Sequence, residues 1–164
     1  MTATVELVAR ATLIGVGGSA FIDLWSLSLR RGLHIATLDY ALLGRWIGHF
    51  RRGRFTHPRI AAASPVRGER PLGWAAHYGI GIAFAFVVVA LWGSAWLESP
   101  GILPPLVVGL GSIAAPWFIM QPAFGAGIAG SKTANPVAGR LRNLGTHAAY
   151  GLGLYVTALT LAAL

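Results

Sequence analysis

Long apolar segments separated by shorter polar ones are the dominant pattern along the chain. A helix needs about 20 mostly apolar residues to cross the hydrocarbon core of a bilayer. Four segments approach that requirement, at residues 11–29, 72–97, 103–124 and 144–164. The pattern therefore predicts an all-α fold, in which a single transmembrane domain over residues 1–164 forms a bundle of four membrane-spanning helices.

Prolines modify the third predicted span. Pro116 lies in the middle of the segment, where it removes a backbone N–H and predicts a kink. Pro122 lies near its end and predicts that the helix stops there. We therefore expect the third helix to be bent.

Basic residues are concentrated between the first two predicted spans. The loop over residues 30–71 contains nine arginines, against Asp39 and Glu69 as its acidic residues. The connection between the last two spans adds Lys132, Arg140 and Arg142. The positive-inside rule then places both loops in the cytoplasm and both termini outside. We expect a multi-pass protein of a bacterial inner membrane.

Part of the basic loop has helical periodicity. In residues 38–50 the apolar side chains fall at helical intervals on one face, while Arg45 and His49 fall largely on the other. Asp39 precedes the pattern and suits an N-cap. We predict an amphipathic helix that lies in the membrane interface with its arginines toward lipid head groups.

The composition supports a membrane protein. Of the 164 residues, 55% are hydrophobic and 11% are charged, too few charges to cover a soluble surface of this size. The net charge of +8 would suggest nucleic acid in a soluble protein. Because the basic residues lie between spans, we expect anionic head groups as partners, and no nucleic acid. The absence of cysteine excludes disulfides, thiolate catalysis and cysteine-ligated metals.

A short motif recurs in the second and fourth predicted spans. Tyr78-Gly-Ile-Gly81 matches Tyr150-Gly-Leu-Gly153, and a histidine precedes each copy. Two related hairpins of this kind would form a parallel repeat about an axis along the membrane normal. The small residues in these helices favour close helix packing and a homo-oligomer.

Four sequence strings resemble a known family. They are GRWIGHF, GERPLGWAAHYGIGIAF, PWFIMQPAFGAGIA and HAAYGLGLY. Together they make the whole chain similar to a bacterial family of predicted small integral membrane proteins of unknown function. The resemblance implies four membrane spans, and it implies no activity, substrate, cofactor or catalytic residue.

Each predicted span carries a polar side chain near its cytoplasmic end. These are Asp23, His77, Gln121 and His147, and we expect them to form one layer of ligand-binding or ion-binding candidates. Further candidates close to this layer are the hydroxyls of Tyr78 and Tyr150 and, at its rim, Trp25, Glu69 and Trp74.

Several roles fit these residues. A carboxylate beside two imidazoles suits proton relay, or the binding and transport of a cation or polar solute. A membrane-embedded enzyme acting on a lipid or other hydrophobic substrate would use His77 or His147 as a base. A scaffold that recruits a partner through the basic loop is a third reading, and a haem held between the two histidines is a fourth. The sequence itself assigns no cofactor, metal or reaction.

Overall fold

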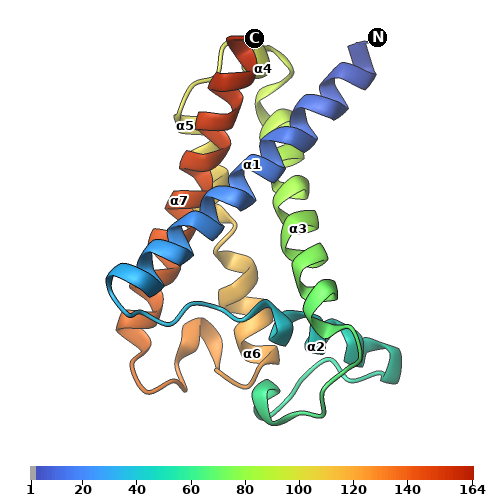
Figure 1. Cartoon of the computed structure of the whole chain (residues 1–164), viewed down its shortest axis with the longest axis vertical. Helices are drawn as coiled ribbons and strands as arrows, with labels where there is room; N and C mark the ends of the chain where they lie inside the picture. Colours follow the sequence, from blue (N-terminus) through green and yellow to red (C-terminus); the bar gives the residue numbers. More distant parts are fainter. Residues whose placement is uncertain (1–2) are drawn as a thin grey trace. The chain divides into compact units, whose positions relative to one another are not determined.

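The computed structural model describes residues 3–164, which contain helices and no strand (Figure 1). The predicted all-α class is therefore confirmed. The chain separates into two compact units. Unit 1 consists of Met1–Thr37, Tyr78–Ser112 and Gly145–Leu164, and unit 2 consists of Leu38–His77 and Ile113–Leu144.

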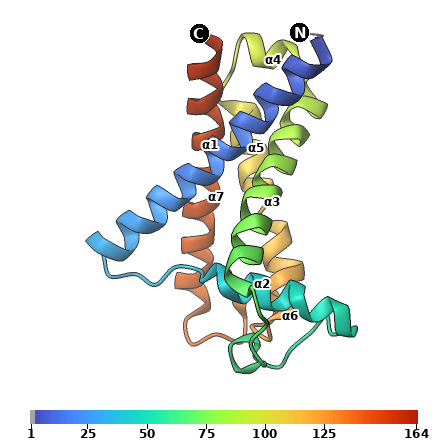
Figure 2. The same ribbon diagram turned by 45° about the vertical axis from the view of Figure 1, so that its right-hand side comes forward.

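Unit 1 is a helical bundle. It is formed by α1 (Ala3–Gly32), α4 (Ala95–Glu98), α5 (Leu103–Gly111) and the larger parts of α3 (Glu69–Trp92) and α7 (Pro136–Ala162). The blue helix α1 crosses the green α3 and the red α7 in both Figure 1 and Figure 2. The helix α1 packs against both α3 and α7, and α5 packs against α7.

Close backbone approach explains this crossing. Gly15 of α1 lies directly against the backbone of Ile82 in α3, where a Cβ atom would clash. Two further small-residue contacts continue the same interface, between Ser19 and Gly81 on one side and between Gly18 and Tyr150 on the other. Small residues allow helices to approach in this way, and the packing contacts of the backbones then hold the crossing.

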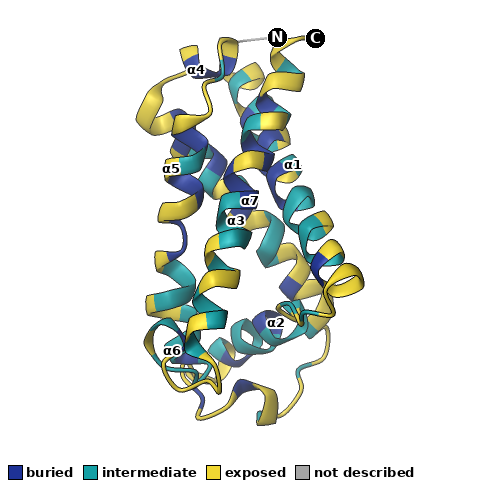
Figure 3. Cartoon of the chain, turned by 90° about the vertical axis from the view of Figure 1, so that its left-hand side faces the viewer, coloured by how far each residue is buried: buried dark blue, intermediate teal, exposed yellow. Residues whose placement is uncertain are grey.

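The core of unit 1 is formed where these helices meet. Its buried apolar side chains come from four helices and include Ala11, Ile14, Ala85, Val88, Trp96, Leu154 and Ala158. Many apolar residues of the helices nevertheless face outward. Figure 3 shows exposed positions along α1, α3, α5 and α7, and Leu24, Leu91 and Leu103 are among the exposed apolar side chains.

Three helical segments are long and apolar enough to cross a membrane. They are Ala3–Gly32, Glu69–Trp92 and Leu103–Ala123. Outward-facing leucines on such helices suit lipid as the surrounding solvent, so the chain has the character of a membrane protein. The helix α7, which covers most of the fourth predicted span, is 27 residues long, but it is not among the helices that are apolar enough. The four-span bundle stays a prediction.

The third span is interrupted, as its proline suggested. The helix α5 ends at Gly111, and a π-helical segment, η3 (Pro116–Met120), follows before α6 (Gln121–Ala123). The N–H of Gln121 donates to the carbonyl of Pro116, five residues earlier, which is the wide turn of a π-helix. Pro116 has no N–H to continue the α-helical ladder, which explains why the regular helix is broken nearby.

Unit 2 is built around the amphipathic helix. The helix α2 (Tyr40–His49) begins where predicted, and the Asp39 carboxylate accepts a hydrogen bond of 2.9 Å from the N–H of Ala41. Its glycine face packs on the first turns of α3, because Gly44 lies against the backbone of Glu69. His49, which the pattern placed on the polar face, is buried. One side of α2 is therefore committed to protein contacts.

The remaining short elements of unit 2 are the 3₁₀ turns η1 (Phe50–Arg52), η2 (Ile60–Ala62) and η4 (Ile128–Gly130). Several helix boundaries differ from the predicted spans: α1 begins at Ala3, eight residues before the predicted start, and two further differences have a clear local cause. The helix α3 stops at Trp92, because Gly93 takes a positive φ of 81° and ends it. The helix α7 begins at Pro136, eight residues before the predicted span, because the Asn135 side chain accepts a bond of 3.0 Å from the N–H of Ala138.

Candidate functional site

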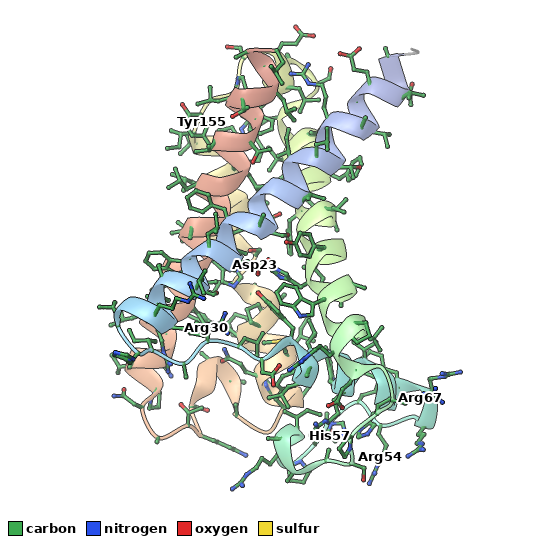
Figure 4. All side chains as sticks on the ribbon, in the orientation of Figure 1. Asp23, Arg30, Arg54, His57, Arg67 and Tyr155 are labelled. Atoms are coloured by element: carbon green, nitrogen blue, oxygen red, sulfur yellow. The ribbon has the colours of Figure 1, made fainter. Side chains whose placement is uncertain are left out.

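Asp23 and Tyr78 are joined by a hydrogen bond in unit 1. The Tyr78 hydroxyl donates to Oδ2 of Asp23 at 2.9 Å, and both side chains are half-buried. Figure 4 shows Asp23 projecting from the middle part of α1. The bond therefore links a carboxylate of the first span to a phenol of the second.

The helix packing explains why these two side chains meet. Gly15, Ser19 and Asp23 are spaced four residues apart, so they lie along one face of α1. Gly15 contacts Ile82, Ser19 contacts Gly81, and Asp23 contacts Tyr78. We call this the Asp23 stripe (Gly15, Ser19 and Asp23). The small residues Gly15 and Ser19 bring α1 and α3 close enough for Asp23 and Tyr78 to form their hydrogen bond.

A carboxylate in a membrane span needs compensation. Moving an Asp to the centre of a spanning helix costs about 3 kcal/mol on insertion scales. One donated hydrogen bond from Tyr78 offsets part of that cost, because bonds to a charged group are stronger than neutral ones. A carboxylate has capacity for about four such bonds, so a cation is also a suitable ligand for it.

His147 is held by a serine in the same unit. Its Nδ1 lies 2.7 Å from Oγ of Ser112 and 3.3 Å from the carbonyl of Gly109. The Ser112 hydroxyl is also 2.6 Å from that carbonyl. The hydroxyl has one proton and two acceptors in reach. When it donates to the carbonyl, Nδ1 of His147 is the N–H group and Nε2 holds the lone pair.

Tyr150 and Trp25 contact neighbouring helices of unit 1. The Tyr150 hydroxyl donates to the carbonyl of Gly81 at 2.5 Å, and the side chain is 3% exposed. It thus ties α7 to α3 one turn away from Tyr78. Trp25 lies against Gly145, and its indole N–H is buried without a hydrogen-bond partner among the described residues.

The other predicted site residues belong to unit 2. His77 stacks on the ring of Tyr40 with centroids 4.2 Å apart, and Trp74 meets the same ring edge-on at 4.8 Å. Gln121 donates to the side-chain oxygen of Asn143 at 3.1 Å. The aromatic cluster and the amide pair are therefore separate features of this unit.

Glu69 has a clear structural partner. Arg45 donates to its two carboxylate oxygens at 2.9 and 2.8 Å, and it donates to the carbonyls of Ala61 and Ala63 at 3.2 Å each. The hydrogen bond to Glu69 raises the pKa of Arg45 above its usual value. Glu69 also accepts from the N–H of Val66 at 2.9 Å. These bonds fold the basic loop onto the start of α3.

A buried histidine pair in unit 2 was not anticipated from the sequence. Nδ1 of His49 lies 2.6 Å from Nε2 of His57, and Nε2 of His49 lies 3.0 Å from the carbonyl of Ser64. The side chains are 2% and 7% exposed. A carbonyl only accepts, so Nε2 of His49 must be protonated. Burial, followed by the neighbouring His49 and Arg54, lowers the pKa of His57 and favours its neutral form.

The predicted polar layer is thus distributed over the two units. Unit 1 contains Asp23 with Tyr78, and separately His147 with Ser112. His77, Gln121, Glu69 and Trp74 belong to unit 2. Within residues 3–164, no three side chains of His, Asp or Glu gather as metal ligands. The partners Ser112, Asn143 and Arg45 had no motif spacing by which the sequence could have revealed them.

A comparison with protein families confirms the resemblance to a family of unknown function. The model of a family described as a protein of unknown function, DUF2938, matches residues 12–161. No curated protein matches the chain, and no solved structure does.

Proposed function

The chain belongs to this DUF2938 family of proteins of unknown function, and we propose that it binds a small cation at Asp23 inside the membrane as a step in transport. The observation that supports the proposal is the hydrogen bond of 2.9 Å between Asp23 and Tyr78 on two apolar spans. It brings a carboxylate oxygen and a phenol oxygen together on helices where a carboxylate is otherwise unfavourable, which supports the proposal.

The chemistry of the pair favours a cation over an anion or an apolar solute. A carboxylate and a phenol offer oxygen atoms, which suit alkali-metal ions and ammonium groups. A bound cation would neutralise the carboxylate. The desolvation free energy of the occupied site in a low dielectric would then be lower than that of the empty site. Sodium, potassium and methylammonium are therefore the first probes to use.

The competing interpretation is that the pair only locks α1 to α3. A lock contributes stability in every solution, whereas a binding site contributes stability that grows with ligand concentration. The two interpretations therefore differ in whether cations change the unfolding of the protein through Asp23.

A thermal unfolding series on the purified full-length protein tests the proposal. We expect one of the three chlorides to raise the unfolding midpoint of the wild type, and Asp23→Asn to abolish the rise. Tyr78→Phe should reduce the rise, because it removes the hydroxyl beside Asp23. Tyr155→Phe is its matched control and should keep the rise, because Tyr155 is a tyrosine of α7 outside the site (Figure 4). Equal responses of wild type and Asp23→Asn to all three salts would contradict cation binding at Asp23.

The proposal includes the remaining expectations about the membrane. We infer that α7 is a fourth span, since 27 residues exceed the length that crosses a ~30 Å core, and that the arginine-rich loop is cytoplasmic in a bacterial inner membrane.

Gly81 and Gly153 of the two motif copies both contact α1, which supports the repeat. Gly79 and Gly111 have no neighbour where a Cβ would stand, which supports a homo-oligomer packed on these faces.

A second candidate is a membrane-embedded hydrolase, favoured by the Ser112–His147 contact of 2.7 Å. That reaction requires the other tautomer of His147, in which Nδ1 holds the lone pair and accepts the Ser112 hydroxyl proton. Oγ of Ser112 attacks an acyl carbonyl carbon while Nδ1 of His147 takes the hydroxyl proton, and the proton passes to the leaving alcohol. Water then releases the acid from the serine. Labelling by a fluorophosphonate probe tests it, with Ser112→Ala expected to remove the label and Ser26→Ala to keep it. Absence of wild-type labelling would contradict it.

A further inference from the structure

The basic loop of unit 2 carries five arginines on a folded surface. They are Arg51, Arg52, Arg54, Arg59 and Arg67, and all five are exposed. We call them, together with Phe55, the arginine surface. Figure 4 shows Arg54 and Arg67 extending outward from their ribbon. None of the five forms an ion pair with a carboxylate in the part of the chain that the structure describes.

The backbone beneath this surface is fixed by polar contacts. Arg45 binds Glu69 and two loop carbonyls, as described above, and the histidine pair joins the end of α2 to the middle of the loop. The N–H groups of His57 and Ile60 donate to the carbonyls of Ala123 and Phe124 at 2.8 and 3.1 Å. Because one arginine neutralises Glu69, the remaining arginines present an uncompensated positive charge.

An aromatic side chain lies among these charges. Phe55 is 57% exposed and follows Arg54 directly. Its carbonyl accepts a bond of 2.7 Å from the indole N–H of Trp46, which holds its backbone in place. Its ring lies 5.1 Å from that of Phe50. An exposed aromatic ring next to arginines is typical of segments that enter the membrane interface.

The loop is joined directly to the start of a candidate membrane span. Arg67 precedes Glu69, the first residue of a helix that is long and apolar enough to span a bilayer, by two residues. Arg67 is therefore attached close to the end of a candidate span, and the other four arginines belong to the same folded loop. A loop that serves only to orient the spans needs charge alone, and this one is also folded by an ion pair and buried hydrogen bonds.

We propose that the arginine surface binds the head groups of anionic phospholipids. The guanidinium groups donate to the phosphate oxygens, and Phe55 enters the interface between them. This binding is separate from the cation site at Asp23, because it uses residues outside the spans.

Lipid retention by the purified full-length protein tests the proposal. The protein is incubated in mixed micelles with equal amounts of phosphatidylglycerol and phosphatidylcholine, and the lipids that remain after gel filtration are measured by mass spectrometry. We expect the wild type to retain phosphatidylglycerol preferentially. Arg51→Gln/Arg52→Gln/Arg54→Gln should lower that preference by at least about tenfold, since each arginine near the surface contributes on the order of a severalfold change and the three changes multiply.

The matched control removes three positive charges elsewhere. Arg30→Gln/Arg31→Gln/Lys132→Gln lowers the net charge equally and should keep most of the preference. Phe55→Ala, which leaves the charge unchanged, should lower retention of phosphatidylglycerol by a smaller factor. Equal losses in the two triple variants, or no loss in either, would overturn the proposal. Tighter binding of a single-stranded oligonucleotide than of phosphatidylglycerol would overturn it in favour of nucleic acid.

Discussion

The two units of the chain are stabilised by different kinds of contact. Unit 1 relies on close helix packing at small residues such as Gly15, with few polar bonds between helices. Unit 2 relies on an ion pair, a histidine pair and hydrogen bonds from side chains to loop carbonyls. The difference follows from their surroundings. An apolar side chain gains little free energy when it moves from lipid into the protein interior, so close packing has to hold the helices together. A polar loop is destabilised when its buried donors lack acceptors, so hydrogen bonds hold it.

The largest expected effect concerns the packing of unit 1. Gly15→Val should lower the free energy of unfolding by about 3 kcal/mol, because the new side chain meets the backbone of Ile82. Denaturant unfolding in detergent measures this change. Gly139→Val in α7 is the control, since nothing lies within 4 Å of a Cβ at that position. Similar losses in both variants would show that the close approach does not hold unit 1 together.

The ion pair should be the main contact that holds the loop of unit 2. Arg45→Gln should destabilise it by about 2 kcal/mol, because it leaves a carboxylate with 17% side-chain exposure without its cation. Amide hydrogen exchange over residues 50–68 should increase in this variant. The exposed Arg51→Gln should leave the exchange unchanged. Equal exchange in wild type and Arg45→Gln would contradict the assigned role.

The histidine pair predicts acid sensitivity confined to the loop. Burial lowers the pKa of His57 below its ordinary value of 6.5, so the folded loop binds protons less well than the unfolded one. The stability that this provides is complete above pH 6.5 and is lost as the pH falls below it. The charged groups that act on the pair are Arg54 near His57 and Glu69 near His49.

Hydrogen exchange as a function of pH tests this sensitivity, once the intrinsic exchange rate is corrected for. The loop should lose protection below pH 6.5, while the helices of unit 1 should not. His57→Gln should flatten the dependence, and His34→Gln should keep it. A pH dependence that is unchanged in His57→Gln would assign the effect to another group.

The smallest expected effect is the loss of one hydroxyl. Tyr78→Phe should lower the free energy of unfolding by about 1 kcal/mol, because Asp23 loses one donor. Tyr155→Phe should change it by much less. Unfolding curves in buffer without added alkali cation measure both variants. A larger loss in Tyr155→Phe would mean that the Asp23–Tyr78 bond contributes little to unit 1.

The sequence predicted the features that depend on local patterns. Apolar length identified the helices, Asp39 identified the start of α2, and Pro116 identified the irregular third span. These signals are contained within a few turns of chain. The beginning of α7 was missed because the cap of Asn135 extends the helix into a polar segment.

The contacts between distant segments could not be predicted in the same way. Arg45 and Glu69 are 24 residues apart, and Ser112 and His147 are 35 residues apart. A charge pattern assigned Arg45 to lipid, whereas the structure gives it to Glu69. Such pairs depend on which distant segments pack together in the fold, and the hydropathy pattern carries no information about that.

The central claim, that a cation binds at Asp23, is tested most directly by infrared difference spectroscopy. Membranes containing the wild type are perfused alternately with sodium, potassium or methylammonium chloride and with a bulky, non-coordinating salt. We predict a shift of the carboxylate bands for at least one of the three cations, a shift that disappears in Asp23→Asn and remains in Glu98→Gln. An unchanged difference spectrum in Asp23→Asn, or no carboxylate shift with any of the three cations, would contradict the account.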